Sequence, residues 1–65
     1  SGAACFSLNV TKKDEVDTFL SRVEPFGGAV TKPAEITAWR VYAGFFSDPD
    51  GHLWEVAWSP KLAAL

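Results

Sequence analysis

The chain has 65 residues, 48% of them hydrophobic, with three Trp, five Phe and a single Cys, and its formal net charge is −2. This length allows one domain, a lone Cys excludes an internal disulfide, and the acidic balance argues against a nucleic-acid or anionic-membrane partner, since both need clustered Lys and Arg. No apolar run approaches the roughly 20 residues of a membrane span and no signal peptide is recognised, so we expect a cytoplasmic protein. Met is absent even at position 1, so we expect a start left by cloning or a piece of a longer protein.

The first third of the chain predicts a strand followed by a helix. Residues 4–10 alternate between apolar and small or polar side chains, which is the period of a strand. Four apolar residues then fall at the spacing of one helical face: Val16, Phe19, Leu20 and Val23. Thr11 and Asp14 predict an N-terminal cap for this helix. The helix should end near Glu24, because Pro25 disfavours a helical conformation in the residue before it.

Three further strands are predicted in the rest of the chain. Residues 29–35 form a weaker strand, which we place at a sheet edge because Pro33 cannot donate to a ladder. Residues 41–47 are rich in β-branched and aromatic side chains, which favour a strand. The sequence DPDG at 48–51 is typical of a type I turn, and residues 52–58 form the last strand. The order strand, helix, strand, strand, strand predicts an α+β fold.

One helix can cover only one face of a four-stranded sheet, so the other face is expected to be bare. A hairpin with Pro49 and Asp50 at its tip would place Gly44 opposite Glu55. Tyr42 and Phe46 would then flank this pair on the same face. The bare face is expected to carry Cys5, Ser7, Tyr42, Gly44, Phe46, Leu53 and Glu55. The helix is expected to cover Phe6, Leu8, Val10, Ala43, Phe45, Trp54 and Val56. A bare surface of this mixed character predicts a concave half-site that another copy or another half must close.

The stretch DPDGHLWEV, residues 48–56, closely resembles the second half of proteins in the vicinal oxygen chelate superfamily. This superfamily includes glyoxalase I, bleomycin resistance proteins and extradiol dioxygenases, and the resemblance extends over residues 4–60. It implies that residues 1–65 form a single βαβββ module with the strand order first, fourth, third, second. The implied partner is a second module, supplied by a homodimer or by an absent N-terminal half, so that two sheets form a cup around a small organic molecule.

The resemblance also implies which residues could bind a metal. In members that use one, each module supplies a first-strand ligand, usually His, and a carboxylate from its last strand. Carried over, the carboxylate is Glu55 and the first-strand ligand falls on Cys5. The implied cofactor is a divalent metal, Zn²⁺, Ni²⁺ or Mn²⁺, of which thiolate suits Zn²⁺ and Ni²⁺ better than Mn²⁺. Besides carrying Cys5 in place of His, the chain departs from the family in having one module and in a helix shortened by Pro25.

Three functions remain open. The leading one is bleomycin-resistance-like binding of a small molecule, in which Glu55 holds a polar or cationic group and Ser7 lies nearby. The aromatic residues expected to line this cup are Trp39, Tyr42 and Phe46. The alternative is a glyoxalase I-like lyase or isomerase, in which Glu55 is catalytic and holds the metal or moves a proton next to a carbonyl. The third is an assembly half without a site of its own.

Several of these residues also have a purely structural interpretation. The three aromatic residues can serve the core or the module interface instead of a ligand, and Cys5 can be a small buried hydrophobe. His52 lies on the strand face opposite Glu55 and is expected to pack near the turn or face solvent. Asp48 and Asp50 resemble a chelating pair, but turn chemistry accounts for both.

Overall fold

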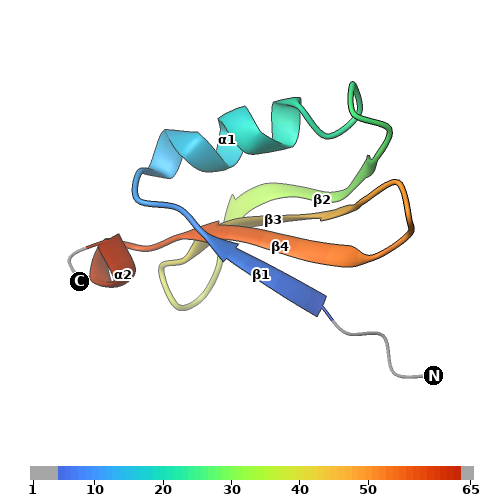
Figure 1. The fold of residues 1–65 in the computed structure, drawn as a ribbon. Coiled ribbons are helices and arrows are strands. Elements are labelled where there is room, and N and C mark those ends of the chain that lie inside the picture. The colour runs from blue at the N-terminus through green and yellow to red at the C-terminus, as the bar shows by residue number, and fades with distance from the viewer. Residues whose placement is uncertain (1–4, 64–65) are drawn as a thin grey trace.

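A helix lies across one face of a four-stranded sheet in the computed structural model, which describes residues 5–63 (Figure 1). The elements are β1 (Cys5–Asn9), α1 (Lys13–Ser21), β2 (Ala29–Ile36), β3 (Tyr42–Ser47), β4 (Leu53–Trp58) and α2 (Pro60–Ala63). The predicted order of one helix and four strands is confirmed, and α2 occupies part of the tail that the sequence left unassigned. Ala4, expected to open the first strand, lies outside the described residues. Neither helix of the described range is long and apolar enough to cross a membrane.

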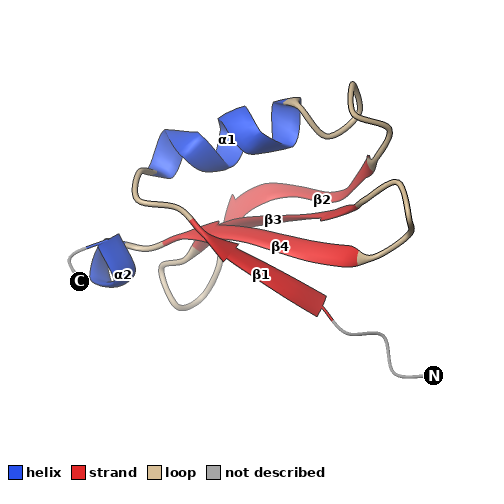
Figure 2. Ribbon diagram, in the orientation of Figure 1, coloured by secondary structure: helices blue, strands red, loops and turns tan. Residues whose placement is uncertain are grey.

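The strand order is β1-β4-β3-β2, as the family resemblance implied. β1 runs parallel to β4, while β4 and β3 are antiparallel, as are β3 and β2. β2 therefore lies at a sheet edge, as predicted from Pro33, and its pairing with β3 is interrupted by two register shifts around Lys32. Figure 2 shows the resulting two layers, with α1 above the sheet and no helix or strand of residues 5–63 covering the sheet below.

The start of α1 is held by Glu15, so the predicted cap involving Asp14 is wrong. Glu15 Oε1 accepts hydrogen bonds from Thr11 Oγ1 at 3.0 Å, from the Thr11 backbone N–H at 3.1 Å and from the Lys12 backbone N–H at 2.8 Å. The bonds from the Thr11 hydroxyl and from these N–H groups hold the pKa of Glu15 below its ordinary value. A carboxylate here also suits the positive end of the helix dipole.

The helix ends three residues before the expected boundary at Glu24. The backbone N–H of Arg22 donates to Phe19 O and that of Val23 to Leu20 O, which is the tighter i to i+3 pattern of a 3₁₀ turn. The chain then passes through turns to Gly28, whose N–H donates to Val23 O at 3.0 Å. The apolar spacing extended to Val23 and correctly predicted its burial, but it did not show that the last turn tightens.

The core lies between α1 and the sheet. Its buried members are Val16, Val23, Phe46 and Val56, of which Val16 and Val56 are fully buried. Gly44 has a packing role there: a Cβ at this position would meet Leu20 Cδ1 at 2.5 Å. A glycine in the middle of β3 therefore lets the helix approach the sheet closely.

The register between β3 and β4 differs by one residue from the prediction. Glu55 lies opposite Phe45, and Gly44 lies opposite Val56. The prediction assumed a two-residue tip, whereas Ser47 pairs with Leu53 and the connecting loop comprises residues 48–52. Because side chains alternate along a strand, this one-residue difference exchanges the two faces of β3. Tyr42, Gly44 and Phe46 therefore lie beneath α1, and Ala43 and Phe45 lie on the uncovered face.

Candidate functional site

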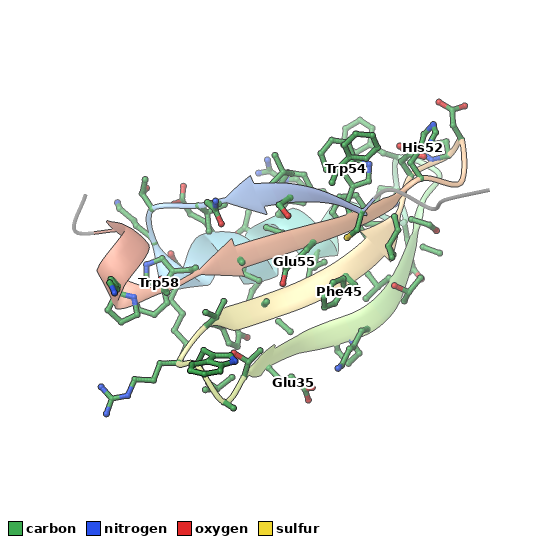
Figure 3. The ribbon with its side chains drawn as sticks, turned by 90° about the horizontal axis from the view of Figure 1, so that it is seen from below. Glu35, Phe45, His52, Trp54, Glu55 and Trp58 are labelled. Atoms are coloured by element: carbon green, nitrogen blue, oxygen red, sulfur yellow. The ribbon has the colours of Figure 1, made fainter. Side chains whose placement is uncertain are left out.

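The uncovered face of the sheet, which we call the open face, has Glu55 at its centre. In the rows of paired residues, Glu55 lies between Ser7 on β1 and Phe45 on β3. Figure 3 views the open face directly and shows Glu55 beside Phe45, with Glu35 toward the edge formed by β2. Both Glu55 and Phe45 are half-buried. A carboxylate on a central strand is therefore flanked by an aromatic ring on one side and a hydroxyl on the other.

The surroundings of Glu55 on the open face are mainly apolar. Ala43 and Ala57 pair with each other and are only 3% and 5% exposed, so the sheet has small side chains next to the Glu55 row. Leu53 lies at the neighbouring position along β4 and is 36% exposed. This part of the face combines small and large apolar side chains with one central charge, which is the composition expected of a ligand-binding wall.

Glu55 forms no side-chain hydrogen bond and no ion pair with any other residue in the range 5–63. Glu35 on the same face differs, because its carboxylate lies 3.5 Å from Lys32 Nζ. Partial burial without a partner is unfavourable for a charged group, since it loses hydration without gaining a compensating contact. The Glu55 carboxylate is thus an acceptor available to a molecule from outside this module.

The two β1 residues predicted near Glu55, Ser7 and Cys5, lie at different distances from it along the strand. Ser7 is the direct register partner of Glu55, whereas Cys5 pairs with Leu53, one same-face position away. Cys5 is exposed, so its interpretation as a small buried hydrophobe is wrong. Within residues 5–63, no three His, Cys, Asp or Glu side chains come close enough to hold a metal ion. One module alone therefore does not fit a closed metal site, which usually needs three or four protein ligands.

Two of the predicted cup residues belong to the core side instead. Phe46 is 6% exposed and stacks on Trp54 with ring centroids 6.1 Å apart, so its placement beside Glu55 was wrong. Tyr42 Oη donates to Asp17 Oδ1 of α1 at 2.6 Å, and this hydrogen bond raises the pKa of Tyr42. Both side chains face α1 because of the one-residue difference in register.

The third aromatic residue of the prediction, Trp39, is in the loop between β2 and β3. Its side chain is 86% exposed, and its backbone N–H donates to Thr37 Oγ1 at 3.4 Å. A ligand-lining role for Trp39 stays a prediction. The sequence reasoning missed Phe45, the ring that does lie beside Glu55. A five-residue loop at 48–52, rather than a two-residue tip, would have predicted that Phe45 pairs with Glu55.

Asp48 fixes this loop by accepting three hydrogen bonds. Its Oδ2 accepts from Trp54 Nε1 at 3.0 Å, and its Oδ1 accepts from the backbone N–H groups of Asp50 and His52, each at 2.9 Å. The bond from the Trp54 indole and those from the two N–H groups hold the pKa of Asp48 below its ordinary value. Gly51 has φ +87°, a conformation that glycine adopts without strain. The turn interpretation of Asp48 is confirmed.

His52 packs on the helix side of the sheet. Its ring meets that of Phe6 edge-on at 5.9 Å, and Phe6 in turn lies 4.9 Å from the ring of Trp54. Because Trp54 and Glu55 are adjacent in β4, their side chains point to opposite faces. The prediction that His52 packs near the turn, away from Glu55, is confirmed.

Comparison with protein families gives a match that covers most of the chain. The model of the Glyoxalase/Bleomycin resistance protein/Dioxygenase superfamily matches residues 2–56. This range contains β1, α1, β2, β3 and the part of β4 that includes Glu55. No curated protein matches the chain.

Several solved structures contain the same fold. A glyoxalase-related enzyme from Fulvimarina pelagi is 34% identical, with a TM-score of 0.84, over 91% of this chain and 42% of its own. A hypothetical protein from S. aureus is 30% identical, with a TM-score of 0.78, over 88% of this chain and 50% of its own. A glyoxalase/bleomycin resistance protein/dioxygenase family enzyme from Burkholderia phytofirmans is 20% identical, with a TM-score of 0.82, over 89% of this chain and 46% of its own. The chain thus spans half or less of the length of these structures.

Proposed function

Because the chain belongs to the Glyoxalase/Bleomycin resistance protein/Dioxygenase superfamily, we propose that its open face is one wall of a small-molecule site that a second module closes. The observation that carries this proposal is the half-buried Glu55 carboxylate, which has no hydrogen-bonding or ionic partner within residues 5–63. A half-buried carboxylate without a partner lowers the stability of a single module. A ligand that donates to it removes this cost, and the same ligand can cover the exposed apolar surface around it.

The two edges of the sheet support a second module placed along β1. The edge strand β2 carries Pro33 and two register shifts, both of which hinder pairing with a further strand. The edge strand β1, with sequence CFSLN, has neither proline nor charge along its free edge. A partner at β1 continues the sheet next to Ser7 and brings its own wall toward Glu55. The solved relatives, which are about twice as long, have room for two such modules.

The chemistry of the open face favours a flat ligand that carries a positive charge or a strong hydrogen-bond donor. Phe45 offers a ring face, Leu53 offers aliphatic surface, and the Glu55 carboxylate accepts from the polar group. The alternative function, a metal-dependent lyase or isomerase, needs ligands from two modules, since within residues 5–63 no three His, Cys, Asp or Glu side chains come close enough to hold a metal ion.

N-Methylquinolinium, a flat aromatic cation, is a suitable probe for this site. We expect its titration into the ¹⁵N-labelled chain to shift the amide resonances of Phe45, Glu55 and Ser7 saturably. Glu55→Gln should weaken binding about threefold to tenfold, because one charge-assisted contact at a partly exposed site is lost. Glu35→Gln is the matched control, since Glu35 lies on the same face but is paired with Lys32. Equal binding by the wild type and Glu55→Gln contradicts the proposal.

Native mass spectrometry in the presence of Zn²⁺, Ni²⁺ and Mn²⁺ separates the two functions. Under the proposed function, we expect a dimer that binds the probe without metal. A dimer that carries stoichiometric metal, lost in Glu55→Gln, would instead support the lyase or isomerase. A chain that remains monomeric and binds neither probe nor metal would leave only an assembly role.

A further inference from the structure

A second surface, on the helix side of the sheet, takes no part in the function proposed above. A cavity of about 360 Å³ lies between the C-terminal end of α1, the turn that follows it and the hairpin joining β3 to β4. Figure 1 shows that the end of α1 and this hairpin lie at the same end of the molecule. We call this cavity the hairpin cavity. Its volume lies at the lower end of the range of about 300–1,000 Å³ that is usual for small-molecule sites.

Three aromatic rings line the hairpin cavity. Phe46, which is buried, and Phe19, with a ring centroid 5.4 Å away, line it beneath the end of α1. Phe26, in the turn after α1, also lines the cavity and is 78% exposed. An aromatic side chain left this exposed gains free energy when another apolar surface covers it. Three rings around one cavity therefore favour an occupant with a flat apolar body.

The polar groups of the hairpin cavity differ in their availability. Asp48 lines it, but both of its carboxylate oxygens already accept hydrogen bonds within the hairpin. Arg22 also lines it, is exposed, and forms no ion pair or side-chain hydrogen bond with any residue between 5 and 63. Ser47, the last residue of β3, also lines the cavity. The polar group that remains free to bind a ligand is therefore a cation with a planar set of donors.

We propose that the hairpin cavity binds an aromatic anion, with its ring against Phe19, Phe26 and Phe46 and its carboxylate on Arg22. A guanidinium matches a carboxylate through two parallel hydrogen bonds, which gives this class of ligand a defined orientation. A cationic ligand is repelled by Arg22, and a neutral one gains no ionic contact with it. The Asp48 carboxylate, which also lines the cavity, already accepts three N–H donors of its own hairpin. This site lies on the face of the sheet opposite Glu55, so it does not depend on the function of the open face.

The probe for the hairpin cavity is 1-naphthoate, titrated into the ¹⁵N-labelled full chain. We expect saturable shifts of the amide resonances of Phe26, Gly28 and Ser47, which line the cavity, and little change at Phe45 and Glu55 on the open face. Shifts at the cavity residues report on the hairpin cavity, and shifts at Phe45 and Glu55 report on the open-face site. A negative result for one site therefore does not count against the other.

Arg22→Gln is expected to weaken 1-naphthoate binding about threefold to tenfold, because it removes the ionic contact at an exposed site. The neutral analogue 1-naphthylmethanol should bind the wild type and this variant alike. Lys61→Gln, which removes an exposed cation from the last helix, is the matched control and should bind 1-naphthoate as the wild type does. Arg22 is itself exposed, so its substitution should leave the dispersed spectrum of the folded chain intact.

Three results would each overturn the proposal. The first is equal affinity of the wild type and Arg22→Gln for 1-naphthoate, because Arg22 would then serve only the C-terminal end of the helix dipole. The second is a set of shifts centred on Phe45 and Glu55 rather than on Gly28 and Ser47. The third is the lack of any saturable shift at millimolar concentrations of the probe.

Discussion

Replacement of Glu55 with valine tests whether its carboxylate serves a ligand rather than the fold. Glu55 is half-buried opposite Phe45 and has no partner within residues 5–63. Strand preference differs by up to about 1 kcal/mol between residue types and favours valine over glutamate. An aromatic and β-branched cross-strand pair adds about 0.2–1 kcal/mol. Because such terms do not add fully, we expect Glu55→Val to raise the free energy of unfolding by about 1 kcal/mol, or Tm by about 4–8 °C for a domain of this size.

Urea unfolding followed by Trp fluorescence measures this change. Protein concentration must be equal for all samples, because association through a second module would also raise the apparent stability. Val56→Ala is the matched control from the adjacent position, where the side chain is fully buried beneath α1. It removes two buried carbons at about 0.8 kcal/mol each and leaves a cavity, so we expect a loss of about 2–3 kcal/mol.

The opposite sign for Glu55→Val would refute the reasoning. If Glu55→Val lowers the free energy of unfolding by about 1 kcal/mol or more, the carboxylate contributes to the stability of the module itself. A gain in stability together with loss of N-methylquinolinium binding would instead show that Glu55 serves ligand binding and lowers the stability of the module. The same variant thus reports on both properties of the open face.

Two further predictions concern the hairpin and the glycines. The indole and backbone N–H groups that donate to Asp48 lower its pKa, so its contribution to stability is present above the ordinary value of 3.8 and is lost as the pH falls through the folded-state pKa. Asp48→Asn should therefore weaken the acid dependence of unfolding; an acid-unfolding profile identical to that of the wild type would contradict this. Gly28→Ala should cost about 1–3 kcal/mol, since its Cβ would clash with the last carbonyl oxygen of β3. Gly44→Ala should cost less, because its closest contact is the flexible Leu20 side chain; urea midpoints in the reverse order would refute this comparison.

Local patterns were sufficient to predict α1 and the four strands, though not α2. The apolar spacing that ends at Val23 predicted the helix, and the alternation around Glu55 predicted the last strand and the faces of its side chains. Pro33 predicted an edge strand because a residue without an N–H cannot serve two neighbours. The order of the strands came from the family resemblance rather than from these patterns. Each local prediction depends on properties of a few adjacent residues, which the sequence shows directly.

The composition of the candidate site needed the tertiary structure. Periodicity correctly assigned Glu55 to the uncovered face, but the residues beside it depend on the register between two strands. That register depends on a five-residue loop, which Asp48 stabilises by bonding to the indole of Trp54, six residues away. The contact exists only once the hairpin has closed. It moves Phe45 to the open face and Phe46 to the core.

The sequence by itself determined α1, the four strands, the edge position of β2 and the face on which Glu55 lies, because period and local backbone restriction act over a few residues. Only the tertiary structure decided which ring accompanies Glu55, that Glu15 rather than Asp14 holds the start of α1, and that Arg22 lies at a cavity next to the hairpin. These features depend on hydrogen bonds and packing between segments. A side-chain pattern specifies which face a residue occupies, whereas its neighbours are fixed only when the strands and the helix have been brought together.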